Sequence, residues 1–408
     1  MKKMKNSIIH VGVVILNSAI SFGINVILAK YFTVVEYGFL SSTLAISSML
    51  GAIVALEIDK NAGKMAAVES EKNVYAIVSS LRLAALILAV MFILTYKLVA
   101  GNDSFERTFY WLLLFSGAIS GLNIAYFLEL TGTYHIYVIA IFIEKIVLLA
   151  LISVLFLQSL LTPLTYAAAF LFVTTTSVAL QNIYVSKSCV IKFSEVLFLS
   201  AGFFAYLKKN IFENILLVFL VFIQSGFTGW SRALYGEVYG FESVAFFSVA
   251  LQFVVIYSIF LGNFERIWRP IIYKDLLRNS FHSAFKYTLF SALYVLLAST
   301  FLYLLFDNII IFFFDQKYFD VIYYFPFLVL QSLAILINSL ATIFTLNFKK
   351  PFILLISNCA AISFIALILF QFEFEHLYVF VLMIPITQII LSIFAIIYSV
   401  KINPVLNS

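Results

Sequence analysis

Three charged residues lie deep within long apolar segments of this 408-residue chain, namely Arg82, Glu144 and Lys145. Counted from the cytoplasmic ends of their segments, Arg82 lies about 11 Å and Lys145 about 17 Å into the membrane at the helical rise per residue. Charged side chains at such depth are rare and usually face a cavity or a partner. The chemistry open to them is the non-covalent binding of an anionic group inside a membrane.

The sequence leaves two readings of these charges open. Glu144 and Lys145 are neighbours, but adjacent helical side chains point about 100° apart and pair poorly. We therefore expect Glu144 to pair with Arg82 on another helix. In the functional reading, Arg82 and Lys145 bind a ligand in a cavity and Glu144 is a counter-charge or an ion-coupling site. In the structural reading, the three residues form an ion-pair network between helices.

Further cations lie at the ends of predicted helices. Arg232 is a lone cation at the outer end of the seventh helix, where it could guide an anion out of a cavity or snorkel to the interface. Arg266 and Arg269 lie at the inner mouth of the eighth helix. There they could recruit an anionic lipid, or they could belong to the general excess of basic residues on the cytoplasmic side.

Amide side chains form a second polar group within the apolar segments. Amides both donate and accept hydrogen bonds, so they can bind hydroxyl-rich ligands or join helices to one another. We expect a mixture of the two roles. The residues are Asn17, Asn25, Asn123, Gln181, Asn182, Gln224, Gln252, Gln331, Asn338, Asn358 and Gln388.

Several kinds of chemistry are not expected, because the residues that carry them do not occur in the required patterns. The four histidines and two cysteines are scattered and match no metal or redox spacing. No Walker motif and no Rossmann glycine pattern is found. We expect no cofactor, no nucleotide hydrolysis and no enzymatic activity, so that energy would come from an ion gradient, the membrane potential or consumption of the product.

Membrane-spanning helices must position all of these residues. The chain is 63% hydrophobic and 11% charged, whereas soluble domains are roughly 25% charged. Despite the net charge of +5, we expect membrane lipids and no nucleic acid as partners. About 20 apolar residues cross a bilayer as a helix. Twelve such segments are predicted at 7–29, 37–57, 75–98, 108–129, 135–157, 163–186, 210–231, 242–264, 284–306, 320–346, 352–371 and 377–400.

The basic residues predict the orientation. About 18 of the 25 Lys and Arg residues fall on one side of these segments, together with both termini. The positive-inside rule makes that side cytoplasmic, so we predict an N-in and C-in protein of the plasma membrane. The first segment is longer than a signal-peptide core and no clear cleavage site follows it, so we expect it to remain as a spanning helix. The outer loops are too short to hold a catalytic domain.

The segments divide into two similar halves. Each half begins with a basic cluster and one helix, followed by a short outer turn with a lone cation and a second helix with a mixed-charge inner end. We predict an N-terminal six-helix lobe at 1–190, a cytoplasmic interfacial linker at 191–209 and a C-terminal six-helix lobe at 210–408. Six is an even number, so both lobes share one orientation and flank a central cavity.

Two stretches carry a resemblance to a known family. The turn Lys30 to Phe39, with its Glu-Tyr-Gly-Phe end, and the second-half stretch from Ser231 to Ala250 resemble polysaccharide biosynthesis flippases. These Wzx-like proteins export O-antigen and capsule units and belong to the multidrug/oligosaccharidyl-lipid/polysaccharide superfamily. Length, helix number and the inner linker match over nearly the whole chain.

The resemblance implies a specific task. It implies movement of an undecaprenyl-pyrophosphate-linked oligosaccharide from the cytoplasmic to the periplasmic leaflet of the bacterial inner membrane. Polysaccharide polymerase and chain-length regulator are the implied protein partners. Asn17, Asn25 and Gln224 are favoured as cavity amides, because the first and seventh helices line the cavity in that family. Arg82 and Lys145 would then face the pyrophosphate.

Two other functions stay open. An ion-coupled drug or metabolite exporter of the same superfamily commonly carries a carboxylate in its first or seventh helix. Segment 7–29 has none, and Glu213 lies only at the inner start of the seventh segment. A membrane-embedded polysaccharide polymerase typically needs a large outer loop, which is missing here. Both readings are therefore less favoured than a flippase.

Overall fold

The computed structural model describes residues 2–55, 71–99, 108–130, 134–189, 230–276, 278, 280–347, 351–371 and 376–401. Within these ranges the regular structure is helical and no strand occurs. The predicted all-helical, polytopic fold is confirmed. The predicted linker at 191–209 and most of the seventh segment lie outside the described residues.

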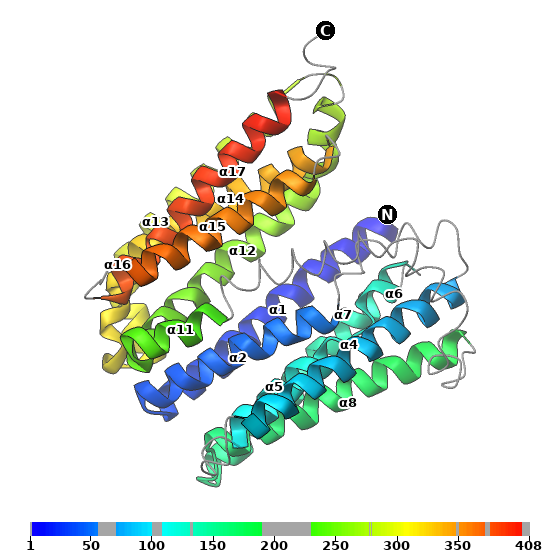
Figure 1. The fold of residues 1–408 in the computed structure, drawn as a ribbon, viewed down its shortest axis with the longest axis vertical. Coiled ribbons are helices and arrows are strands. Elements are labelled where there is room, and N and C mark those ends of the chain that lie inside the picture. Colours follow the sequence, from blue (N-terminus) through cyan, green and yellow to red (C-terminus); the bar gives the residue numbers. More distant parts are fainter. Residues whose placement is uncertain are drawn as a thin grey trace. The chain divides into compact units, whose positions relative to one another are not determined.

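The first half contributes seven described helices (Figure 1). They are α1 (Lys2–Tyr31), α2 (Val34–Ala55), α4 (Glu71–Val99), α5 (Thr108–Ser120), α6 (Ala125–Leu130), α7 (Tyr134–Leu157) and α8 (Pro163–Cys189). The predicted fourth segment is broken between α5 and α6, where residues 121–124 leave the helical path.

The second half contributes seven α-helices and one 3₁₀ helix among the described residues. They are α11 (Trp230–Tyr239), α12 (Phe241–Leu276), α13 (His282–Phe314), the 3₁₀ helix η2 (Gln316–Tyr324), α14 (Phe325–Asn347), α15 (Pro351–Gln371), α16 (Leu377–Val381) and α17 (Met383–Lys401). The last predicted segment is interrupted at Leu382, three residues before Pro385.

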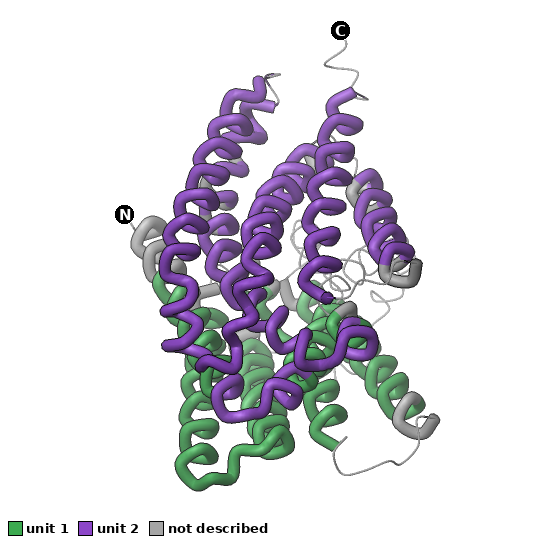
Figure 2. Tube along the Cα trace, turned by 90° about the vertical axis from the view of Figure 1, so that its left-hand side faces the viewer, with its two compact units in different colours: residues 1–27, 39–234 green, residues 28–38, 235–408 purple. Residues whose placement is uncertain are grey.

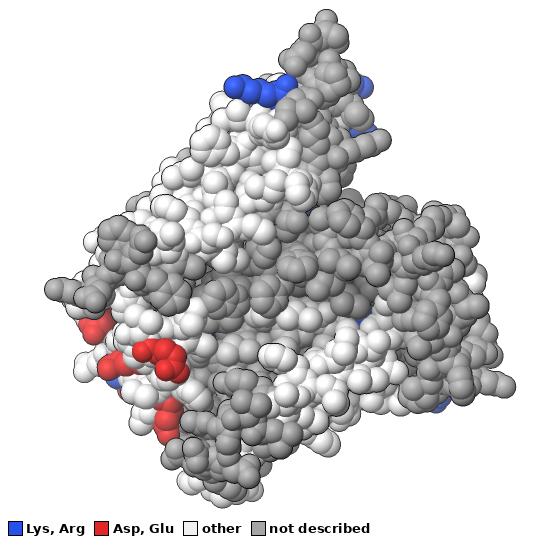
Figure 3. All heavy atoms as spheres, viewed as in Figure 1, with Lys and Arg blue, Asp and Glu red and all other residues white. Residues whose placement is uncertain are grey.

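Eight stretches in the described part of the chain are long and apolar enough to span a bilayer, and three shorter apolar helices accompany them. Many large apolar side chains on them face outward, such as Leu88, Phe301 and Leu304. In a membrane protein this surface meets lipid rather than water. In the view of Figure 3 several acidic side chains lie close together, and most of the remaining described surface is uncharged. The chain is a multi-pass membrane protein.

The chain forms two compact units (Figure 2). One unit comprises residues 1–27 and 39–234, and the other comprises residues 28–38 and 235–408. We call them the N-terminal and the C-terminal unit. The tip of the first helical hairpin, 28–38, therefore belongs to the C-terminal unit, although both helices of that hairpin continue into the N-terminal unit.

Helix packing within the N-terminal unit depends on small residues. A Cβ atom on Gly117 of α5 would lie 2.0 Å from the carbonyl oxygen of Ser47 on α2, and one on Gly51 would lie 2.8 Å from the carbonyl oxygen of Gly117. Ser47 also donates from Oγ to the carbonyl oxygen of Leu113 at 2.5 Å. Because these positions carry no larger side chain, α2 and α5 approach to backbone contact, as small residues permit in membranes.

Most polar side chains inside the spans are satisfied locally. Ser80, Ser332 and Thr345 each donate to the carbonyl oxygen four residues earlier, at 2.8 Å in every case. Such bonds spare a hydroxyl the cost of an unmet donor in hydrocarbon. The polar groups that bond across helices instead are therefore the informative ones.

Charged residues lie at both ends of α12 in the C-terminal unit. Glu242 lies at its start, and Asp315 and Lys317 follow the end of α13, whereas Lys274 and Asp275 lie at the far end of α12. Contacts of η2 with both α12 and α13 place the first three at the same end. The orientation with the basic side in the cytoplasm stays a prediction.

Candidate functional site

The N-terminal unit contains a partly open cavity of about 640 Å³ between α4, the break that joins α5 to α6, and α8. Most of its wall surface is apolar. The polar side chains on the wall are Tyr75, Ser79, Arg82, Asn123, Thr175, Asn182, Ser186 and Lys187. The described lining thus includes two basic residues and no acidic one.

Arg82 is the largest of the fully buried side chains, with 1% of its surface exposed. Its Nε donates to the carbonyl oxygen of Ala55 at 3.1 Å, and its Nη1 donates to the carbonyl oxygen of Asn123. Ala55 is the last residue of α2, and Asn123 lies in the break between α5 and α6. Carbonyl groups at helix ends lack a partner in their own helix. The guanidinium therefore ties three helical segments together through their backbones.

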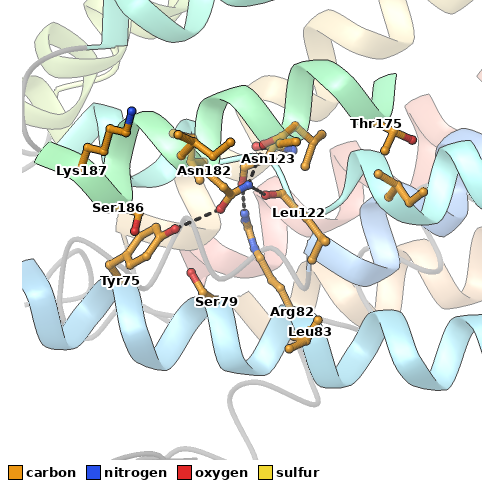
Figure 4. A pocket seen from close by; sticks show the side chains of 15 residues that line it. Tyr75, Ser79, Arg82, Leu83, Leu122, Asn123, Thr175, Asn182, Ser186 and Lys187 are labelled. Carbon is orange, nitrogen blue, oxygen red and sulfur yellow. Dashed lines mark hydrogen bonds between the residues drawn. The ribbon is translucent and has the colours of Figure 1, made fainter. Parts of the chain in front are cut away.

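Asn182 of α8 makes a second set of bonds across the cavity (Figure 4). Its Oδ1 accepts from the Tyr75 hydroxyl at 3.0 Å, and its Nδ2 donates to the carbonyl oxygens of Leu122 at 3.2 Å and Val178 at 2.9 Å. Figure 4 shows the Arg82 and Asn182 side chains pointing toward each other and toward residues 122 and 123. The polar groups of the cavity converge on the helix break.

The helix break has local causes. A Cβ atom on Gly121 would lie 2.5 Å from the carbonyl oxygen of Gly51 and 2.6 Å from Cβ of Val54. Asn123 accepts at Oδ1 from the backbone N–H of Ala125 at 3.2 Å, which caps the start of α6. Glycine and asparagine so placed favour a helix end, and this signal was available in the sequence. The break exposes the carbonyl groups that Arg82 and Asn182 bind.

The predicted pair of Arg82 with Glu144 is not formed in the described structure. Arg82 donates to the backbone carbonyls of Ala55 and Asn123, and Glu144 on α7 makes no ion pair with any described basic residue. The cause is helix placement, because α4 packs on α5 and α6 whereas α7 packs on α6 and α8. Glu144 is not part of the cavity wall, and its ion-coupling role stays a prediction.

Lys145 interacts with an aromatic ring. Its Nζ lies 5.9 Å from the centroid of the Phe170 ring on α8, which is within the range of a cation–π interaction. The side chain is half-buried and is not among those that line the cavity. The structure therefore does not bring Lys145 together with Arg82 in this cavity.

The other predicted cations lie elsewhere. Arg232 on α11 donates from Nη1 to Oγ of Ser41 on α2 at 3.4 Å. Arg269 is exposed and forms an ion pair with Glu265 one turn earlier on α12, with Nε donating to Oε1 at 3.1 Å. Arg266 also belongs to α12, but its side chain lies outside the described ones. Their roles in cargo exit and recruitment stay predictions.

The predicted cavity amides are only partly described. Asn17 and Asn25 both lie on α1 and are half-buried, and Oδ1 of Asn17 is buried without a hydrogen-bond partner. Neither lines the cavity around Arg82. Gln224 lies outside the described residues. The amides that line this cavity are Asn123 and Asn182. Both were among the eleven amides noted in the sequence, but neither was among the three favoured for the cavity.

Known structures share this fold. An inward-facing multidrug resistance MATE family transporter of the MOP superfamily matches 96% of this chain and 93% of its own, at 12% identity and a TM-score of 0.62. The lipid II flippase MurJ in an inward closed conformation matches 98% of this chain and 88% of its own, at 13% identity and a TM-score of 0.68. A eukaryotic MATE transporter matches 95% of this chain and 94% of its own, at 14% identity and a TM-score of 0.56.

Sequence comparison adds no closer relative. No family model and no curated protein matches the chain. At these low identities the structural matches establish the fold alone, which this chain shares with MATE transporters and with the lipid II flippase MurJ. In the described residues no group of histidine, cysteine and acidic side chains is arranged to hold a metal ion.

Proposed function

We propose that this protein is a flippase that carries an undecaprenyl-pyrophosphate-linked oligosaccharide from the cytoplasmic to the periplasmic leaflet of the bacterial inner membrane by alternating access. The O-antigen or capsule type of repeat unit is the proposed cargo. Polysaccharide polymerase and chain-length regulator would act on the product at the outer surface. The movement requires no covalent chemistry, so the protein would not be an enzyme.

The observation that carries this proposal is the cavity around Arg82. Arg82 and Lys187 supply positive charge, and Asn123, Asn182 and Tyr75 supply groups that bond to hydroxyls or phosphate oxygens. Lys187 lies in the last turn of α8, at the end that the predicted orientation places in the cytoplasm. A cationic cavity open near that leaflet suits a lipid whose headgroup bears phosphate and sugar.

The physical need for such a protein is clear. Each polar group that enters hydrocarbon without a partner costs several kcal/mol. An oligosaccharide carries many hydroxyl groups, so unaided crossing is extremely slow. A polar cavity replaces the lost bonds to water while the polyprenyl tail stays in lipid. The fold shared with a lipid II flippase supports a path in which the headgroup passes through the protein and the tail stays in lipid.

Deletion of the gene followed by analysis of lipid-linked oligosaccharide in each leaflet tests the proposal. We expect loss of surface glycan and accumulation of complete single units on the inner leaflet. Accumulation on the outer leaflet would support a polymerase instead. Complementation with Lys187→Gln should restore protein level but not full export, whereas Lys286→Gln, on another exposed lysine near the same membrane face, should restore both.

Export of a drug or metabolite is the second candidate function. It is favoured by the shared fold with multidrug transporters and by the mostly apolar wall of the cavity. It is disfavoured because α1 contains no acidic residue to couple an ion. If deletion leaves all glycans unchanged and raises sensitivity to small toxic cations, export becomes the leading function.

A further inference from the structure

Two lysines hold the tip of the first hairpin, residues 28–38. Each of them donates hydrogen bonds to backbone carbonyl groups near the other lysine's helix. Lys317, at the start of η2, donates from Nζ to the carbonyl oxygens of Lys30 at 2.9 Å and Phe32 at 2.8 Å. Lys30, in the last turn of α1, donates from its own Nζ to the carbonyl oxygen of Phe312 at 2.9 Å, in the last turn of α13. Cations at helix C-termini are favourable because they meet unpaired carbonyl groups.

Aromatic and hydrogen-bond contacts hold the rest of the hairpin tip against η2 and α12. Tyr318 is fully buried and donates from its hydroxyl to the carbonyl oxygen of Ala29 at 3.2 Å. Its ring packs edge-on against Tyr37 with centroids 6.0 Å apart. The Tyr37 hydroxyl in turn accepts from Nε2 of Gln252 on α12 at 2.6 Å. Together with the two lysines, these residues form what we call the lysine clasp: Lys30, Tyr37, Lys317 and Tyr318.

The start of α2 covers one face of α12. A Cβ atom on Gly38 would lie 1.8 Å from the carbonyl oxygen of Phe241 and 3.1 Å from the backbone nitrogen of Ala245. Ser248 stands between this contact and Gln252 on the same helix, and is 3% exposed. Its Oγ is buried without a hydrogen-bond partner. The tip of the hairpin therefore contacts α12 on both sides of the buried Ser248.

Helices α1 and α2 connect the clasp to the N-terminal unit, so motion of that unit acts on the clasp. The tip belongs to the C-terminal unit, while residues 1–27 of α1 and 39–55 of α2 belong to the N-terminal unit. Neither helix contains proline, which is a common cause of sharp bends in helices. Movement of one unit against the other must therefore either bend these helices or release the tip.

We infer that the lysine clasp is a releasable lock on the outer end of the protein, which opens when cargo leaves. The lysines of the clasp bind backbone carbonyl groups. Opening the clasp therefore leaves no buried carboxylate without its basic partner. Lys30 is exposed, so both partners can exchange their bonds for water when the tip departs. The clasp closes on a defined geometry, and its opening would also expose the buried rings of Tyr37 and Tyr318. Its role in cargo exit rests on the proposed function, but its opening does not.

The first test measures opening without cargo. In a Cys189→Ser, Cys359→Ser background, Ser248→Cys is labelled from outside with a membrane-impermeant maleimide. Lys317→Met, alone or with Lys30→Met, should raise the labelling rate about five- to tenfold, because the population shifts toward the open state. Lys317→Arg should restore the slow rate, since arginine also donates to carbonyl groups. Ser159→Cys, in the exposed turn after α7, should label equally in all variants and controls for reagent access.

The second test closes the clasp covalently. Lys30→Cys and Lys317→Cys are joined by a short, reductively cleavable thiol cross-linker, and export of lipid-linked oligosaccharide is measured before and after cleavage. We expect export to stop when the clasp is joined and to recover on cleavage. Undiminished export by the joined protein would show that the tip stays with the C-terminal unit and that α1 and α2 bend instead.

The two tests fail in different ways. Unchanged labelling of Ser248→Cys in the double lysine variant would overturn the lock, whatever the cargo is. Altered labelling in a protein that moves no lipid-linked oligosaccharide would leave the lock in place and overturn the proposed function.

Discussion

The hydroxyl of Tyr75 on α4 donates to Oδ1 of Asn182 on α8 at 3.0 Å, across the cavity of the N-terminal unit. Because Asn182 also binds the carbonyl oxygen of Leu122, this single amide connects two helices and the break between α5 and α6. Side-chain bonds to Asn182 therefore link the helices on opposite sides of the cavity.

Removing the Tyr75 hydroxyl should loosen this connection. Tyr75→Phe leaves Oδ1 of Asn182 without its donor, and we expect a loss of about 1 to 3 kcal/mol in the free energy of unfolding. Thermal unfolding in detergent measures the change. Tyr303→Phe, on an exposed tyrosine of α13, is the matched control and should unfold like the parent. Equal stability of the two variants would mean that the bond contributes nothing.

Replacement of Arg82 should separate its bracing role from its charge. Arg82→Met leaves two backbone carbonyls without donors, and we expect a loss of about 2 to 6 kcal/mol in stability, at about 1 to 3 kcal/mol for each carbonyl, together with loss of export. Arg82→Lys keeps the charge but not the planar fork of donors. We expect it to recover part of the export and little of the stability. Full export by Arg82→Met would show that the cavity does not need this cation.

Neutralising Lys187 should affect transport without affecting folding. The side chain is exposed at the end of α8, so Lys187→Gln should change stability by less than about 0.5 kcal/mol. Binding of pyrophosphate-bearing lipid should weaken, and more strongly at low than at high ionic strength, because salt screens exposed charges. Binding measured in detergent at two salt concentrations tests this. Identical affinities for variant and parent would remove Lys187 from the site.

Replacing two glycines of the first hairpin with alanine should change the stability of the protein in opposite directions. Gly38→Ala places Cβ against the carbonyl oxygen of Phe241, so the tip must shift, and we expect lower stability and faster labelling of Ser248→Cys. A Cβ on Gly23 would meet no atom within 4 Å. Gly23→Ala should therefore raise helix stability by up to about 1 kcal/mol. The order of unfolding temperatures among the two variants and the parent decides the prediction.

The Glu-Tyr-Gly turn shows how a sequence motif becomes intelligible in three dimensions. Glu36 accepts from the backbone N–H of Thr33 at 2.9 Å, and its own N–H donates to Oγ1 of Thr33 at 3.2 Å, which is a capping box for α2. Tyr37 and Gly38 contact Tyr318 and Phe241. The capping role could be predicted from residue spacing, whereas contacts with residues more than 200 positions away could not.

The sequence by itself determined the spanning segments and identified the polar residues that lie inside them. Hydrophobic length predicts a spanning helix because every backbone group must be satisfied inside the bilayer, and eleven of the twelve predicted segments coincide with described helices or helix pairs. Depth within a segment marked Arg82 as a residue with a special environment, and its burial bears this out.

Only the tertiary structure decided which polar groups meet. Sequence spacing places a side chain on its own helix but says nothing of which neighbour it faces. For that reason Arg82 was expected to pair with Glu144 and instead binds the backbone of Ala55 and Asn123. Lys30 and Lys317, nearly 300 residues apart, meet only because folding places the ends of α1 and α13 together.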